Sequence, residues 1–162
     1  MNEPDVMVYL MTGFLDSGKS QFLKFTLTQD YFQIDGTTLL ILCEEGEEEF
    51  DPLEMAKHGV KIIKIEEQEE LTEAFLNELH EKYSPERVVI EYNGMWKVSD
   101  FEALSLPQGM GNRTETDQQW MQVHFRMYLN NLKPLFVEMV RGAELVLFNR
   151  CTDIEPLAGI PQ

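Results

Sequence analysis

The feature that most constrains this chain is a segment from Gly13 to Ser20 that fits the pattern G-x-x-x-x-G-K-[ST] at every fixed position. An apolar run, Val6 to Met11, precedes it and is typical of a buried strand. The segment Gln21 to Gln29 follows, mixes apolar with polar side chains and lacks Gly and Pro, which predicts a helix on one face of a sheet. The order of strand, glycine loop and helix is the context that makes this motif credible.

The residue types of this segment suit a polyphosphate. Gly13 and Gly18 let the backbone curl so that its N–H groups point inward at the start of a helix. Lys19 is expected to reach the β- and γ-phosphates, and the Ser20 hydroxyl to bind magnesium. We therefore predict a phosphate-binding loop (P-loop) for a nucleotide; a chance match in a glycine turn is the alternative. Further contacts are expected from Asp16, Ser17 and Gln21, with Asp16 weakening affinity by charge repulsion.

The amino-acid composition disfavours some classes of binding partner. The chain has 162 residues, 43% of them hydrophobic, and a formal net charge of -16, which is unfavourable for binding nucleic acid or an anionic membrane. No apolar run approaches the length of about eighteen residues that a membrane helix needs, and no secretory leader pattern is present. Two cysteines, Cys43 and Cys151, are most simply reduced thiols. We expect one cytoplasmic domain over residues 1–162.

The rest of the chain alternates apolar runs with amphipathic segments. Strands are predicted at 37–43, 60–65, 87–92, 120–125 and 144–148, helices at 51–58, 68–83 and 131–142, and a polar loop at 105–118. This alternation predicts an α/β fold with a mostly parallel central sheet and helices on both faces.

Two later segments are expected to reach the same site. Glu91 ends an apolar strand, where an acid that orients magnesium is expected, and the backbone N–H of Gly94 is placed to approach the γ-phosphate. An acidic run, Glu44 to Glu49, follows the strand at 37–43. Such a run is often only a solvated loop, but loops at the carboxyl ends of parallel strands form the ligand crevice of α/β sheets.

Four segments together resemble the nucleotide-binding domain of the CobW/HypB/UreG family of P-loop GTPases. The first is the P-loop, similar to G-F-L-G-S-G-K-T; residues 43–51 are similar to N-E-F-G-E-x-G-x-D, and residues 90–94 to I-E-T-S-G. Phe148-Asn149-Arg150 stands where the guanine-reading N-K-x-D begins. The resemblance spans about residues 6 to 153.

This resemblance implies a three-layer P-loop NTPase fold and a GTPase that binds GTP and GDP with magnesium. It further implies a slow metallochaperone or cofactor-maturation switch that acts on a client metalloprotein or a cofactor enzyme and forms a homodimer. The implied catalytic residues are Lys19, Glu47, Asp51 and Glu91, of which Glu47 or Asp51 would align the attacking water. The implied metal ligands are Ser20, Glu44 and Glu91, and the implied base-reading residues are Asn149, Arg150 and Asp153.

The chain also departs from the family pattern. It lacks the C-x-C-C motif of metal-handling members. Because Cys43 lies beside the acidic run, a transition-metal site at this place stays an alternative. Thr152 stands where N-K-x-D has its Asp, and Asp153 comes one residue late, so GTP is not distinguished from ATP by this motif. Relatives continue beyond this point into a carboxyl-terminal domain, so the chain is expected to be either a fragment or a minimal protein.

Two other functions remain open on the residues alone. One is an ATP-using P-loop kinase acting on a small molecule, with Arg113 and Arg126 as phosphate clamps. The other is a nucleotide-sensing interaction domain with little turnover, which the altered base motif and Asp16 favour.

Overall fold

The computed structural model describes residues 6–14, 17–44, 49–112, 117–121 and 145–149. Its strands are β1 (Val6–Gly13), β2 (Thr38–Leu42), β3 (Val60–Lys64), β4 (Arg87–Glu91), β5 (Met110–Asn112), β6 (Asp117–Met121) and β7 (Leu145–Asn149). They form one sheet in the order β3-β2-β4-β1-β6-β7, with β5 also paired to β1. Each of these pairings is parallel.

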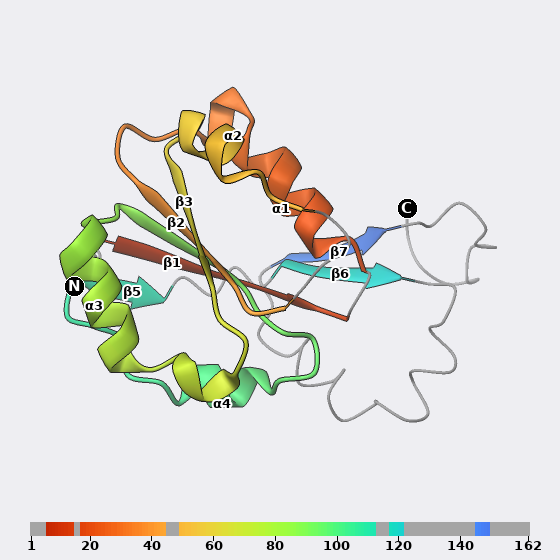
Figure 1. The fold of residues 1–162 in the computed structure, drawn as a ribbon. Coiled ribbons are helices and arrows are strands. Elements are labelled where there is room, and N and C mark those ends of the chain that lie inside the picture. Colours follow the sequence, from red (N-terminus) through yellow and green to blue (C-terminus); the bar gives the residue numbers. More distant parts are fainter. Residues whose placement is uncertain (1–5, 15–16, 45–48, 113–116, 122–144, 150–162) are drawn as a thin grey trace.

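Helices lie on both faces of this sheet (Figure 1). They are α1 (Lys19–Leu27), α2 (Pro52–Lys57), α3 (Glu73–Tyr83) and α4 (Val98–Glu102), with single 3₁₀ turns at Asp30–Phe32 and Gln68–Glu70. Figure 1 shows α1 and α2 above the sheet and α3 and α4 below it. The structure therefore confirms the predicted α/β class with a parallel sheet.

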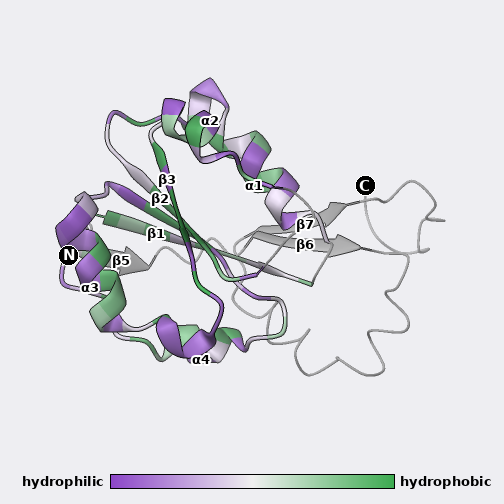
Figure 2. Ribbon diagram, in the orientation of Figure 1, coloured by the Kyte–Doolittle hydropathy of each residue, from purple (hydrophilic) through white to green (hydrophobic). Residues whose placement is uncertain are grey.

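Strand β2 shows why the sheet needs helices on two sides. All of its residues are buried, because successive side chains point to opposite faces and both faces are covered. Leu39 and Ile41 join one apolar cluster, whereas Leu40 and Leu42 join the other, with Leu23 of α1. In Figure 2 strands β1 and β2 are mostly green, while the helices mix purple and green.

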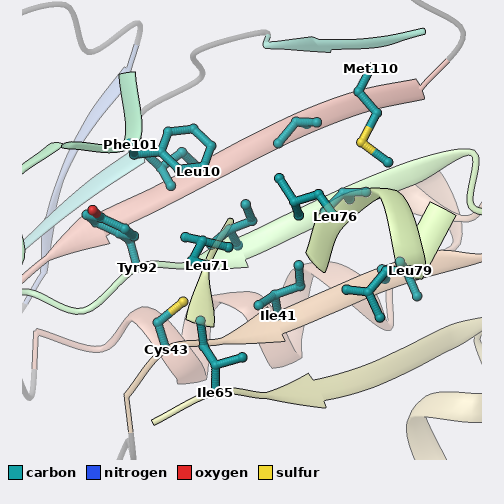
Figure 3. Close-up of a cluster of buried hydrophobic side chains, with 14 of the residues drawn as sticks. Leu10, Ile41, Cys43, Ile65, Leu71, Leu76, Leu79, Tyr92, Phe101 and Met110 are labelled. Carbon is teal, nitrogen blue, oxygen red and sulfur yellow. The ribbon is translucent and has the colours of Figure 1, made fainter. Parts of the chain in front are cut away.

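The larger cluster lies between the sheet and helices α3 and α4 (Figure 3). Leu76 and Leu79 of α3 pack in this cluster with Leu10 and Ile41, and Phe101 of α4 lies against the Tyr92 ring at a centroid distance of 5.9 Å. Burial of a Leu or Phe side chain contributes about 1.5 to 3 kcal/mol, so this layer is a main source of the stability of the fold.

The predicted helix at 68–83 is divided in the structure. A 3₁₀ turn covers Gln68–Glu70, and α3 begins only after Thr72, which is extended and accepts a hydrogen bond from the Phe75 N–H. A threonine hydroxyl at this position satisfies a backbone donor that the helix itself leaves unpaired. The periodicity of apolar residues extended through Leu71, so it did not reveal this cap.

The segment predicted as a loop at 105–118 contains strand β5 and the first residues of β6. Strand β6 also begins earlier than the predicted strand at 120–125, whose last residues lie outside the described part of the chain. Both strands are defined by backbone pairing with β1, which polar residues and glycine can make without any apolar pattern. Helix α4 was not predicted; it buries Val98 and Phe101.

The other predicted elements match to within a few residues, and β7 corresponds to the strand expected at 144–148. The helix predicted at 131–142 lies outside the described residues. None of the helices in the described ranges has the length and apolar character needed to cross a membrane.

Candidate phosphate-binding site

The site lies where three neighbouring strands end. Strand β4 sits between β1 and β2, and the register places Glu91 beside both Met11 and Leu42. Because these strands are parallel, the segments that leave them start from the same edge of the sheet. Those segments are the loop from Gly13 to Gly18, the start of the acidic run at Glu44, and residues 92–97 after β4.

Helix α1 begins at this edge with an uncapped N-terminus. Gly18 precedes the helix in the left-handed region, at φ 95° and ψ 17°, and no side chain of the described residues caps the helix. A glycine adopts this conformation without the strain that a Cβ would cause. The first N–H groups of a helix have no partner within it, so an uncapped end favours an anion. The Phe22 N–H donates to the Gly18 carbonyl at 2.9 Å.

Lys19 is buried within this loop, with only 2% of its surface exposed. Its Nζ donates hydrogen bonds of 2.8 Å to the carbonyl oxygens of Gly13 and Phe14. It also forms an ion pair of 2.6 Å with Oε1 of Glu44, which comes from the end of β2. The ammonium group is therefore held at the loop by one carboxylate and two carbonyls.

Ser20 joins the loop to β4. Its hydroxyl donates a 2.6 Å hydrogen bond to Oε1 of Glu91. The carboxyl group of Glu91 is 1% exposed, and its second oxygen, Oε2, has no hydrogen-bond partner among the described residues. Burial raises the pKa of Glu91; the Ser20 hydrogen bond and the Lys19 charge act in the opposite direction, and the charge of Glu44 raises it further.

Magnesium fits this pair of side chains. A hydroxyl and a carboxylate are oxygen ligands, which Mg²⁺ prefers, and the second oxygen of Glu91 is a buried acceptor without a protein donor in the described part of the chain. Mg²⁺ generally keeps several waters and binds through one or two side chains and substrate phosphates. Ser20 and Glu91 could therefore hold it, directly or through water.

Gly94 completes the site from the segment after β4. Its N–H donates a 2.9 Å hydrogen bond to Oε2 of Glu44. A Cβ at this position would collide with the carbonyl oxygen of Gly13, so the two segments touch through their backbones. The neighbouring Asn93 side chain donates to the Cys43 carbonyl at 3.2 Å, which ties this segment to the end of β2.

The structure thus brings together most of the predicted residues that it describes. The group that meets around the loop consists of Gly13, Ser17, Gly18, Lys19, Ser20, Glu44, Glu91 and Gly94. Gln21 lies in the first turn of α1 with its side chain exposed. Asp16, Glu47, Arg150 and Asp153 lie outside the described residues, and so do Arg113 and Arg126. Asn149 is described only as the backbone at the end of β7.

Asp51 has a structural role in this state. It is exposed and caps α2, where its carboxylate accepts a 2.9 Å hydrogen bond from the Leu53 N–H. This contact does not involve Lys19, Ser20 or Glu91. The prediction that Asp51 aligns the attacking water stays a prediction.

Cys43 belongs to the apolar core. Its side chain is 1% exposed and packs in the larger cluster (Figure 3). Burial raises the pKa of its thiol strongly, and the negative charges of Glu91 and Glu44 add to this effect. A protonated thiol is a poor metal ligand. Within the described ranges, no group of three or more His, Cys, Asp and Glu side chains is arranged to hold a metal ion.

The pairing of Lys19 with Glu44 is the part of the site that the sequence did not reveal. The acidic run was expected near the crevice, but the strand order was needed to place its first residue beside the loop lysine. Comparison of the chain with protein-family models, curated proteins and solved structures gives no match. The resemblance to CobW/HypB/UreG proteins therefore depends on the four motifs alone.

Proposed function

We propose that this chain is a P-loop GTPase domain with a three-layer fold, which binds GTP and GDP and hydrolyses GTP slowly with magnesium. The observation that supports it best is the meeting of three groups at one edge of the sheet. These are the uncapped start of α1, the buried ammonium of Lys19, and the Ser20 hydroxyl bonded to Glu91. Together they supply backbone donors, a cation and a magnesium ligand pair for a triphosphate.

Each residue has a defined task in this proposal. The N–H groups at the start of α1 bind phosphate oxygens, and Lys19 neutralises charge on the β- and γ-phosphates. Ser20 and Glu91 hold magnesium, which supplies charge neutralisation between the phosphates when bound. The N–H of Gly94 donates to the γ-phosphate, and Glu47 or Asp51 aligns the attacking water.

The biological role in this proposal follows from the family resemblance. Such GTPases couple nucleotide state to a partner, so the chain would act as a metallochaperone or cofactor-maturation switch with a client metalloprotein, and as a homodimer. Asn149, with Arg150 and Asp153, would contact the guanine base. The acidic loop would respond to the γ-phosphate through Glu44, which already contacts Lys19 and Gly94.

A titration of GTP, GDP and ATP, with and without magnesium, tests the proposal. Isothermal calorimetry on the wild type and Lys19→Ala should show GTP binding by the wild type and a loss of about a hundredfold or more in the variant, because a buried cation in contact with phosphate is removed. Lys57→Ala is the matched control, since Lys57 is an exposed lysine at the end of α2. Equal weak binding of all nucleotides by all three proteins would reject the proposal.

The same experiment separates the two alternatives. Selective binding of ATP, with phosphate appearing on an added acceptor, would favour a small-molecule kinase. Tight nucleotide binding with no phosphate release across a range of divalent metals would favour a sensing domain with little turnover.

A further inference from the structure

The carboxylate of Glu44 bridges two donors that come from different segments. Its Oε1 is 2.6 Å from the Nζ of Lys19, and its Oε2 accepts the N–H of Gly94 at 2.9 Å. Only 7% of the Glu44 side chain is exposed. A carboxylate buried to this degree between an ammonium group and a backbone N–H is a specific contact, unlike the surface pairs that contribute little.

These two donors are also the ones that the proposed function assigns to the terminal phosphate of the nucleotide. A carboxylate and a phosphate both present oxygens that share negative charge to the same kind of donor. Lys19 and Gly94 cannot give the same hydrogen bonds to Glu44 and to a phosphate oxygen at once. A triphosphate must therefore displace Glu44, or bind without these donors.

The charges around Glu44 also favour its displacement by a phosphate. Glu44 lies close enough to Glu91 for its charge to raise the pKa of that carboxyl. A phosphate at the Lys19 ammonium would place more negative charge beside these two acids, and repulsion between close like charges is strong where water is excluded. The departure of Glu44 relieves part of this repulsion.

We propose that Glu44 is an internal competitor of the γ-phosphate, and so a residue that sets the preference between nucleoside triphosphate and diphosphate. This inference rests on the proposed function. In the free protein Glu44 holds Lys19 and Gly94, and a γ-phosphate exchanges with it. A diphosphate lacks the group that reaches Gly94, so its binding depends less on the removal of Glu44. Glu44 thereby reduces the difference in affinity between GTP and GDP.

The test compares wild type, Glu44→Gln and Glu49→Gln by titration with GTP and GDP in the presence of EDTA. Excluding divalent metal removes any contribution of Glu44 to magnesium. Glu49→Gln removes the same charge from the same acidic run at an exposed position, and so controls for net charge. We expect Glu44→Gln to bind GTP about tenfold more tightly than wild type, the scale of one charge-assisted hydrogen bond. GDP should gain less, and Glu49→Gln should match wild type.

A second variant and a second measurement distinguish the proposed effect from a folding defect. Glu44→Asp keeps the charge on a shorter side chain that cannot span both donors, so its gain for GTP should be smaller than that of Glu44→Gln. The melting temperature of Glu44→Gln should fall without nucleotide, because Lys19 loses its buried partner, and should rise more than that of wild type on addition of GTP.

The outcomes separate this inference from the proposed function. If wild type binds GTP and Lys19→Ala does not, but Glu44→Gln binds GTP no more tightly than wild type, the competitor role is wrong and the function stands. An equal gain for GTP and GDP would also overturn the role in triphosphate preference. If neither wild type nor Glu44→Gln binds any nucleotide, in EDTA or with magnesium, the inference and the function fail together.

Discussion

The hydroxyl of Ser20 and the carboxylate of Glu91 are joined by a 2.6 Å hydrogen bond although 71 positions separate them in the chain. Ser20 lies in the first turn of α1, and Glu91 is the last residue of β4. The bond forms because β4 is inserted next to β1, so the end of one strand meets the helix that follows the other. A buried hydroxyl and carboxyl pair at the mouth of the loop is the structural basis for the magnesium ligands proposed above.

Replacement of Ser20 tests this pair. Ser20→Ala leaves a buried carboxyl oxygen without its donor, so we expect it to lower the free energy of unfolding by about 1 to 3 kcal/mol. Ser20→Thr keeps the hydroxyl and should stay closer to wild type. Urea denaturation measures both effects, and magnesium-dependent GTP binding should be lost in Ser20→Ala and retained in Ser20→Thr. Equal stability of the three proteins would contradict the importance of the bond.

Glu91 should make the stability of the free protein depend on pH. Because burial raises its pKa in the folded state, the folded protein holds this proton more tightly than the unfolded chain. The stabilisation is complete below the ordinary carboxyl pKa of about 4.3 and is lost as the pH rises through the raised value. Glu91→Gln cannot titrate, so its stability should fall less than that of wild type from about pH 4 upward.

Urea denaturation of both proteins across this pH range measures the difference. Glu66→Gln is the control, because it makes the same substitution at an exposed position. Parallel curves for wild type and Glu91→Gln would show that Glu91 titrates normally in the folded protein.

The contact between Gly94 and Gly13 leads to a third prediction. A Cβ on Gly94 would strike the Gly13 carbonyl, which is backbone and also holds Lys19, so Gly94→Ala should destabilise the protein by about 1 to 3 kcal/mol. The matched control is Gly36→Ala, where the atoms nearest to the new Cβ belong to the exposed, flexible side chain of Glu86. That change should cost about 0.5 kcal/mol or less. Thermal or urea denaturation should rank the two variants in this order, and the reverse order would refute the packing argument.

The thiol of Cys43 is expected to be inert in the folded protein. Burial raises its pKa, so the reactive thiolate is scarce even in mildly alkaline buffer. Iodoacetamide should label Cys43 slowly in the native state and rapidly in urea, as followed for each cysteine peptide by mass spectrometry. Rapid native labelling of Cys43 at the rate of a small free thiol would show that this end of β2 is accessible.

Much of the site was predicted from local patterns. The glycine loop, Lys19 and Ser20 form a contiguous motif, and an apolar run ending in Glu91 marks the end of a strand whatever its neighbours are. The alternation of strands and helices also predicted the parallel sheet. These features depend on backbone geometry and hydrophobic period within a few residues, which a sequence displays directly.

The sequence by itself determined which residues have the chemistry to bind a phosphate, because side-chain type and local spacing fix that. Only the tertiary structure decided the order β2-β4-β1, which brings Glu44 to Lys19 and Gly94. It also decided that β5 and β6 pair with β1 despite their polar sequences. The physical reason is that strands pair through backbone groups that every residue shares, so the choice of neighbour depends on packing of the whole sheet rather than on any local pattern.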